Sequence, residues 1–78
     1  MQDIIKTLER YTQDRIPTGS FLHAVLSNDL TMACMKADDY NRHRLFEIVN
    51  YIYNNIPSIS WGSPEKVNNW LKRKEYLD

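Results

Sequence analysis

The chain has little cysteine, glycine or proline, and it has no excess charge of either sign. One cysteine excludes an internal disulfide and a four-cysteine zinc site, and fits a reducing cytoplasm. Two glycines and three prolines are too few for a repetitive or disordered chain. Ten basic residues balance ten acidic ones, so general binding to nucleic acid is disfavoured because no net positive field attracts phosphates.

The sequence also lacks a long apolar run. The amino-terminal residues include Gln2, Asp3 and Lys6, so we expect neither a secretory signal nor a membrane-spanning helix. With 42% hydrophobic residues, residues 1–78 are expected to form a single domain whose core spans about residues 3–75. A domain of this length buries only about 60 to 65% of its unfolded surface, so a homo-oligomer is an open alternative.

Apolar residues recur at helical spacing along the whole chain. The pattern predicts an all-α fold, a compact bundle of four to five short helices with mostly antiparallel neighbours. The first helix is expected over residues 2–14, with Ile4, Leu8 and Tyr11 on its apolar face, and Pro17 and Gly19 predict a turn after it. The other helices are expected at about residues 21–26, 30–35, 39–55 and 64–75.

The segment from about Asp39 to Asn55 has the strongest amphipathic pattern and is expected to be one long, central helix that Asp38 or Asp39 caps. We expect Phe46 and Tyr53 to widen its apolar stripe and Tyr51 to lie elsewhere on the surface. The stripe itself contains Leu45, Ile48, Val49, Ile52 and Ile56.

A serine, a proline and a glutamate in sequence predict the start of the last helix. Ser63 can accept a hydrogen bond from a first-turn amide, and Pro64 fits the first helical position. Spacing from Val67 predicts that Trp70 is in the core. Trp61 precedes the helix and is expected to close the bundle, although its face is also suited to stacking on a planar ligand.

Two sets of residues contain the chemical groups of an active site or a metal site. His23, Asp29 and Cys34 supply a base, an acid and a nucleophile, but no glycine-flanked elbow surrounds Cys34, which is expected to pack as a small hydrophobe. Asp38, Asp39 and His43 have a spacing that allows two ligands to converge on a metal, but helix capping explains the same acids. We therefore expect no metal and no cofactor.

Arginines and tyrosines on the segment from residue 40 to residue 53 are the better candidates for binding. The guanidinium groups of Arg42 and Arg44 suit phosphate or carboxylate oxygens, and pairing with acidic neighbours such as Asp39 is the alternative. The nearby tyrosines and asparagines are typical of a contact surface, because they combine apolar area with uncharged hydrogen-bonding groups.

Several landmarks are distributed over about four-fifths of the chain, from Tyr11 to Leu71. They are Ile16–Leu22, Ala24–Leu26 followed by Asn28–Leu30, Ala37-Asp38 followed by Asn41, Ile48-Val49 followed by Tyr51 and Tyr53, and Trp61–Val67 followed by Trp70-Leu71. On these landmarks the segment resembles a group of small proteins encoded by tailed bacteriophages and prophages. None of the landmarks is an active-site signature, so the resemblance implies a biological context and no particular reaction.

Together with the absence of a catalytic constellation, the resemblance implies a non-enzymatic protein in the cytoplasm of an infected bacterium, which antagonises a host defence or modulates a host enzyme by stoichiometric binding. Its target is expected to be either a nucleotide-derived signal or a host protein. For a nucleotide signal, the expected residues are Arg42 and Arg44 for phosphate, Trp61 or Tyr40 for stacking, and Asn28 or Asn41 for polar recognition. For a protein target, Tyr51 and Tyr53 are the expected anchors.

Two other classes of function are left as alternatives. A helical regulator of phage DNA transactions would use local positive charge, although the neutral chain argues against it. An enzyme would require Cys34 or His23 as a reactive group, and the surrounding residues do not favour this.

Overall fold

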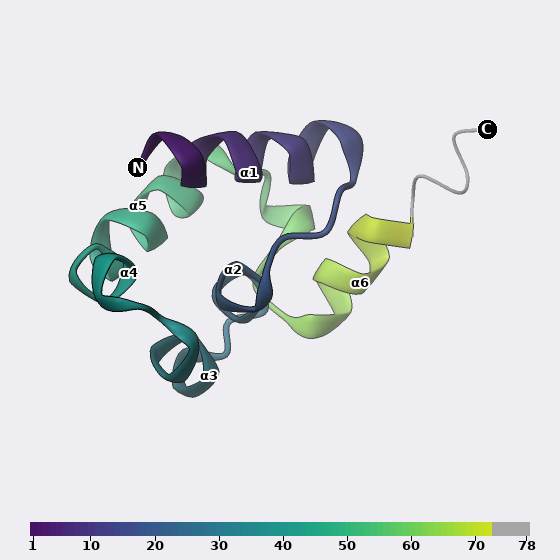
Figure 1. The fold of residues 1–78 in the computed structure, drawn as a ribbon. Helices are drawn as coiled ribbons and strands as arrows, with labels where there is room; N and C mark the ends of the chain where they lie inside the picture. Colours follow the sequence, from purple (N-terminus) through teal and green to yellow (C-terminus); the bar gives the residue numbers. More distant parts are fainter. Residues whose placement is uncertain (73–78) are drawn as a thin grey trace.

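The computed structural model describes residues 1–72, and within that range it contains six α-helices, one 3-10 turn and no strand. The all-α fold is confirmed, and the number of helices is higher than the predicted four to five. In chain order the elements are α1 (Gln2–Asp14), α2 (Ser20–Leu26), α3 (Leu30–Lys36), α4 (Asp39–His43), α5 (Leu45–Asn55), the 3-10 turn η1 (Ser58–Ser60) and α6 (Pro64–Lys72) (Figure 1). The radius of gyration is 11.9 Å, as a single globule of this length requires.

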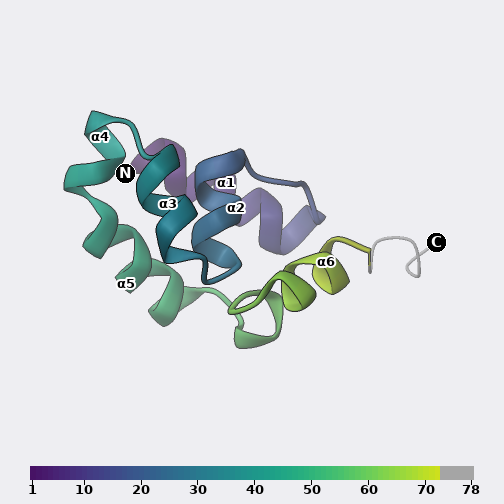
Figure 2. The same cartoon turned by 90° about the horizontal axis from the view of Figure 1, so that it is seen from below.

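The central element is the short helix α2, which lies among α1, α3 and α6 (Figures 1 and 2). The prediction that residues 39–55 form the central helix was wrong. Five of the seven residues of α2 are apolar and buried around most of its circumference, so it needs neighbours on several sides. These residues are Phe21, Leu22, Ala24, Val25 and Leu26.

The predicted long helix of residues 39–55 is divided at Arg44 into α4 and α5. Asp38 caps α4 as expected, since its carboxylate accepts a hydrogen bond from the Asn41 amide at 2.8 Å. Arg44 leaves helical geometry at ψ 12°, and its amide donates to the Asn41 carbonyl at 3.1 Å. Helix α4 buries no side chain, so no core packing holds it in line with α5.

The orientation of α5 also differs from the prediction. Ile48 and Ile52 are fully buried and fix the side of α5 that faces the core. Phe46 and Tyr53 point more than about 100° away from that direction around the helix, and are 82% and 74% exposed. Tyr51, which was expected elsewhere on the surface, is half-buried and packs against the core.

Two hydrogen bonds connect α1 to η1 and to α6. The Tyr11 hydroxyl donates to the Ser60 carbonyl at 2.6 Å, and the Trp70 Nε1 donates to the Tyr11 carbonyl at 2.9 Å. The Arg15 guanidinium lies 3.5 Å from the centre of the Trp70 ring. Burial raises the pKa of Tyr11 to about 12, and the positive charge of Arg15 opposes part of that shift. We call these four residues the Tyr11–Trp70 cluster.

Helix α6 begins as the sequence predicts. The Ser63 hydroxyl accepts a hydrogen bond from the Lys66 amide at 3.1 Å, and Val67 and Trp70 are buried. The predicted extension of this helix to about Glu75 lies outside the described residues. No helix within residues 1–72 is long and apolar enough to cross a membrane.

Candidate functional site

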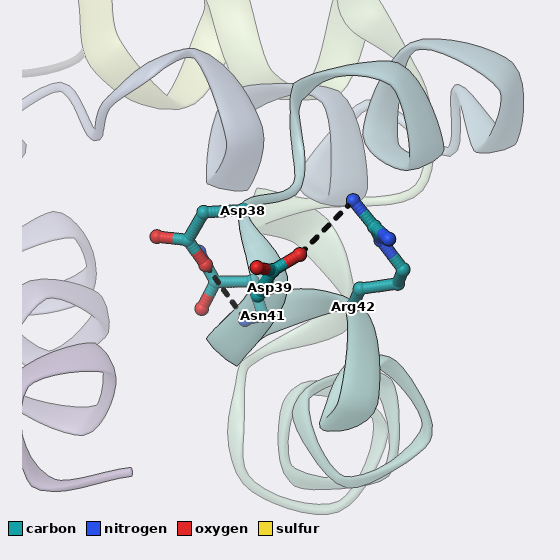
Figure 3. Close-up of polar contacts among 4 residues, drawn as sticks. All are labelled: Asp38, Asp39, Asn41 and Arg42. Atoms are coloured by element: carbon teal, nitrogen blue, oxygen red, sulfur yellow. Dashed lines mark hydrogen bonds and ion pairs between the residues drawn. The ribbon is translucent and has the colours of Figure 1, made fainter.

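The first candidate, Arg42, forms an ion pair on the exposed side of α4 (Figure 3). Its Nη2 lies 3.3 Å from the Asp39 Oδ1, and both side chains are mostly in solvent. This is the acidic pairing expected as the alternative to ligand binding. An exposed pair of this kind contributes little to stability, and it leaves most of the guanidinium accessible.

Arg44 and Tyr40 form a contact of their own. The Arg44 guanidinium carbon lies 4.0 Å from the centre of the Tyr40 ring, a cation–π distance. The Tyr40 hydroxyl accepts a hydrogen bond from the amino group of Met1. Arg44 therefore covers one face of the ring that was expected to stack on a planar ligand.

Asn28 has a backbone role that explains the presence of an asparagine. It follows α2 with φ 62°, a left-handed conformation that asparagine tolerates better than most residues. Its amide donates to the Val25 carbonyl, and the Asp29 amide donates to the Ala24 carbonyl, which together form a Schellman motif. The Asp29 carboxylate then caps α3 by accepting a hydrogen bond from the Met32 amide at 3.1 Å.

Within residues 1–72, none of three separate hollows is lined by more than two of the six residues expected to bind a nucleotide signal. Trp61 and Asn28 line a hollow that includes none of the other four. Asn41 lines a separate hollow beside α1 and α2, whose lining is about equally polar and apolar. The structure thus brings together Trp61 with Asn28, and Tyr40 with Arg44, as two distinct pairs.

The hollow at Trp61 lies where α3 faces α5. It has a volume of about 190 Å³ and a mainly apolar lining, with Asn28 and Asp29 at its polar edge. We call it the Trp61 hollow. The apolar lining includes Leu30 and Ala33 of α3, Leu45, Val49 and Ile52 of α5, and Trp61 itself.

Two properties of the Trp61 hollow bear on what it can hold. An apolar cavity of about 150 Å³ accommodates one benzene ring, so a hollow of about 190 Å³ accommodates one large apolar side chain. Pockets for larger organic ligands have volumes of about 300–1,000 Å³. The Trp61 Nε1 is shielded from solvent and has no hydrogen-bond partner among the described residues.

The outer side of α5 presents a second apolar surface. Phe46, Val49, Asn50 and Tyr53 recur at the spacing of one helix face, and all four are exposed. We call them the α5 stripe. Phe46 and Val49 were both predicted to lie on the apolar stripe that faces the core. The spacing of residues 46, 49, 50 and 53 does suggest a separate face, but the direction of the core cannot be known before folding.

The residues considered for catalysis and metal binding are dispersed or engaged in capping. Cys34 is exposed, so the expectation that it packs as a core residue was wrong. His23 and Asp29 line a shallow hollow between α2 and α3 whose lining does not include Cys34. Within residues 1–72, no three histidine, cysteine, aspartate or glutamate side chains are grouped closely enough to hold a metal ion.

Comparisons of the chain with protein-family models, with curated proteins and with solved structures found no match. The resemblance to small phage proteins therefore stays a prediction. Any function has to be argued from the surfaces that the described residues form.

Proposed function

We propose that this chain is a non-enzymatic binding protein whose Trp61 hollow receives one apolar side chain of a partner protein. The observation that carries the proposal is the hollow itself, an apolar recess of about 190 Å³ with an aromatic wall. Buried anchor side chains that fill such recesses dominate the energy of many protein interfaces. The mode of binding is an amphipathic helix laid between α3 and α5.

The size and chemistry of the hollow favour a protein partner over a nucleotide-derived signal. The phosphates of a nucleotide are bound mainly by cationic side chains, and the lining contains neither lysine nor arginine and only one side-chain amide, that of Asn28. Asp29 at the edge of the hollow would repel an anion. A partner helix with a positive group beside its apolar anchor is compatible with the same carboxylate.

The biological role follows from the resemblance to phage proteins. In that context the partner is a host protein, and stoichiometric binding antagonises a host defence or modulates a host enzyme. The nucleotide-signal alternative uses Arg42 and Arg44 and does not depend on the Trp61 hollow.

The test compares two variants of α3 that differ only in position. Leu30 lines the hollow and is 71% exposed, whereas Met35 lies on the same helix, is 74% exposed and does not line it. Leu30→Glu and Met35→Glu introduce the same charge at equally accessible positions. Each tagged protein is isolated from phage-infected bacteria, and native mass spectrometry measures the stoichiometry of the complex.

We expect a host protein bound in a fixed ratio by the wild type and by Met35→Glu, with at least a tenfold loss in Leu30→Glu. Equal binding by Leu30→Glu would contradict the role of the hollow. Release of a nucleotide-like mass on denaturation, without a bound protein, would overturn the proposal in favour of signal sequestration. Circular dichroism of both variants checks that they remain helical.

A further inference from the structure

Of the α5 stripe, only Val49 also lines the Trp61 hollow, and the composition of the stripe suits one occupant. Phe46 and Tyr53 are 82% and 74% exposed, and Val49 is 41% exposed between them. We propose that a second copy of this chain covers the stripe, with the two α5 helices antiparallel across a two-fold axis. This inference is independent of the proposed function.

The spacing of the stripe is self-complementary. A two-fold interface brings the same patch of both copies together, so each residue must find an acceptable partner in the other copy. With the axis between Val49 and Asn50, Phe46 of one copy faces Tyr53 of the other at both ends of the contact. Aromatic pairs of this kind contribute beyond their buried area.

Charge favours the same arrangement. The stripe contains no ionisable group that is charged at neutral pH, so two copies can approach without like-charge repulsion. In the antiparallel arrangement, the positive amino-terminal end of each α5 lies beside the negative carboxyl-terminal end of the other. A parallel arrangement would place like ends together.

The exposed aromatic area is a substantial part of what a dimer interface needs. The two rings alone present roughly 300 Å² to solvent, since an aromatic side chain offers about 150–250 Å². A typical stable interface buries about 800 Å² on each partner. The two rings thus supply over a third of that area before Val49, Asn50 and flanking side chains are included.

The dimer leaves the Trp61 hollow accessible on its α3 side. Two of the α5 residues of the hollow, Leu45 and Ile52, point about 100° around the helix from the centre of the stripe. Only Val49 belongs to both surfaces. Leu30→Glu is therefore expected to dimerise like the wild type, which separates this inference from the proposed function.

The experiment is sedimentation velocity on the purified chain from about 1 µM to 1 mM, the range of weak to moderate interfaces. The variants are Phe46→Glu and Tyr53→Lys, whose new charges suit the ends of α5 on which they lie. We expect the wild type to reach twice the chain mass of 9.3 kDa. Each single variant is expected to dimerise at least tenfold more weakly.

An equimolar mixture of the two variants tests the antiparallel arrangement. In the mixed dimer, the new carboxylate at position 46 faces the new ammonium group at position 53, and the second aromatic pair stays intact. We expect the mixture to dimerise at least tenfold more tightly than either variant alone. A mixture that stays monomeric would overturn the antiparallel assignment.

Asn68→Glu on α6 is the charge-matched control, and it is expected to leave the dimer unchanged. A wild type that is monomeric up to about 1 mM overturns the proposal, and so do single variants that remain dimers. Dissociation by Asn68→Glu also overturns it, because the effect would then be one of overall charge. All substituted side chains are exposed, and circular dichroism checks that each variant folds.

Discussion

The two tryptophans, Trp70 and Trp61, have different surroundings and different roles in the protein. Trp70 is buried, its Nε1 donates to the Tyr11 carbonyl, and its ring lies under Arg15. Trp61 is half-buried, lines a hollow, and has an Nε1 with no partner among the described residues. The Trp70 ring is part of the core, whereas the Trp61 ring borders an open hollow.

In this small domain, the residues around Trp70 stabilise the fold, whereas the side formed by α3 and α5 is available for binding. The bonds at Tyr11 and Trp70 join residues 49 and 59 positions apart in the sequence, so they fix the topology of the chain. The side formed by α3 and α5 leaves Leu30, Phe46 and Tyr53 exposed. Apolar side chains that folding does not bury are available for contact with another molecule.

Removing Trp70 should have the largest effect on stability. Trp70→Ala deletes a buried ring and leaves the Tyr11 carbonyl without its donor, so we expect a loss of about 3–5 kcal/mol. This is a large part of the stability of any small domain, and the melting temperature should fall by more than about 12 °C. Thermal unfolding, monitored by circular dichroism, measures the change in melting temperature. A loss below about 1.5 kcal/mol would show that the Tyr11–Trp70 cluster does not dominate the fold.

The raised pKa of Tyr11 predicts a specific loss of stability at high pH. Below pH 10 the phenol is protonated in both states, so its contribution is fully present. As the pH rises from 10 to about 12, the unfolded chain loses this proton while the folded chain retains it. The free energy of unfolding should therefore fall by about 2–3 kcal/mol over this window.

Urea unfolding of wild type and Tyr11→Phe between pH 8 and about 12 isolates this contribution. The variant loses the bond to the Ser60 carbonyl, costing about 1 kcal/mol at neutral pH, but it should lack the decline at high pH. Parallel pH profiles for the two proteins would mean that Tyr11 titrates normally. The exposed Tyr53→Phe serves as the control and should follow the wild type.

Local sequence patterns predicted much of the fold. The spacing of Ile4, Leu8 and Tyr11 located α1, and Ser63 and Pro64 located the start of α6. These features depend on residues within one or two turns of each other, so they are present in the sequence before the chain folds.

The surfaces were less predictable, because they depend on contacts between distant segments. The division at Arg44 arises because α4 buries none of its side chains in the core, and the exposure of Phe46 follows from the burial of Ile48 and Ile52. The Trp61 hollow needs α3, α5 and residue 61 in place at once. Trp61 and Asn28 were candidates for one site, but their common hollow is visible only in three dimensions.

The two tryptophans can be compared directly through the same substitution. Trp61→Phe removes from a half-buried ring an Nε1 that has no hydrogen-bond partner among the described residues, so we expect it to cost less than about 1 kcal/mol. Trp70→Phe removes the Nε1 donor and deprives the Tyr11 carbonyl of this hydrogen bond. It should therefore destabilise the protein by about 1–2 kcal/mol more than Trp61→Phe does. Urea unfolding measures both. Equal costs would mean that the Trp61 Nε1 also contributes to the folded state.

The smallest effect is expected on the exposed side of α4. Arg42 and Asp39 are largely in solvent, so their ion pair is screened by water and salt (Figure 3). Arg42→Ala should change the free energy of unfolding by no more than about 0.5 kcal/mol at physiological salt. Urea unfolding with and without added salt tests this. A larger loss that salt removes would mean that α4 depends on this pair in addition to the Asp38 cap and the contact of Tyr40 with Met1.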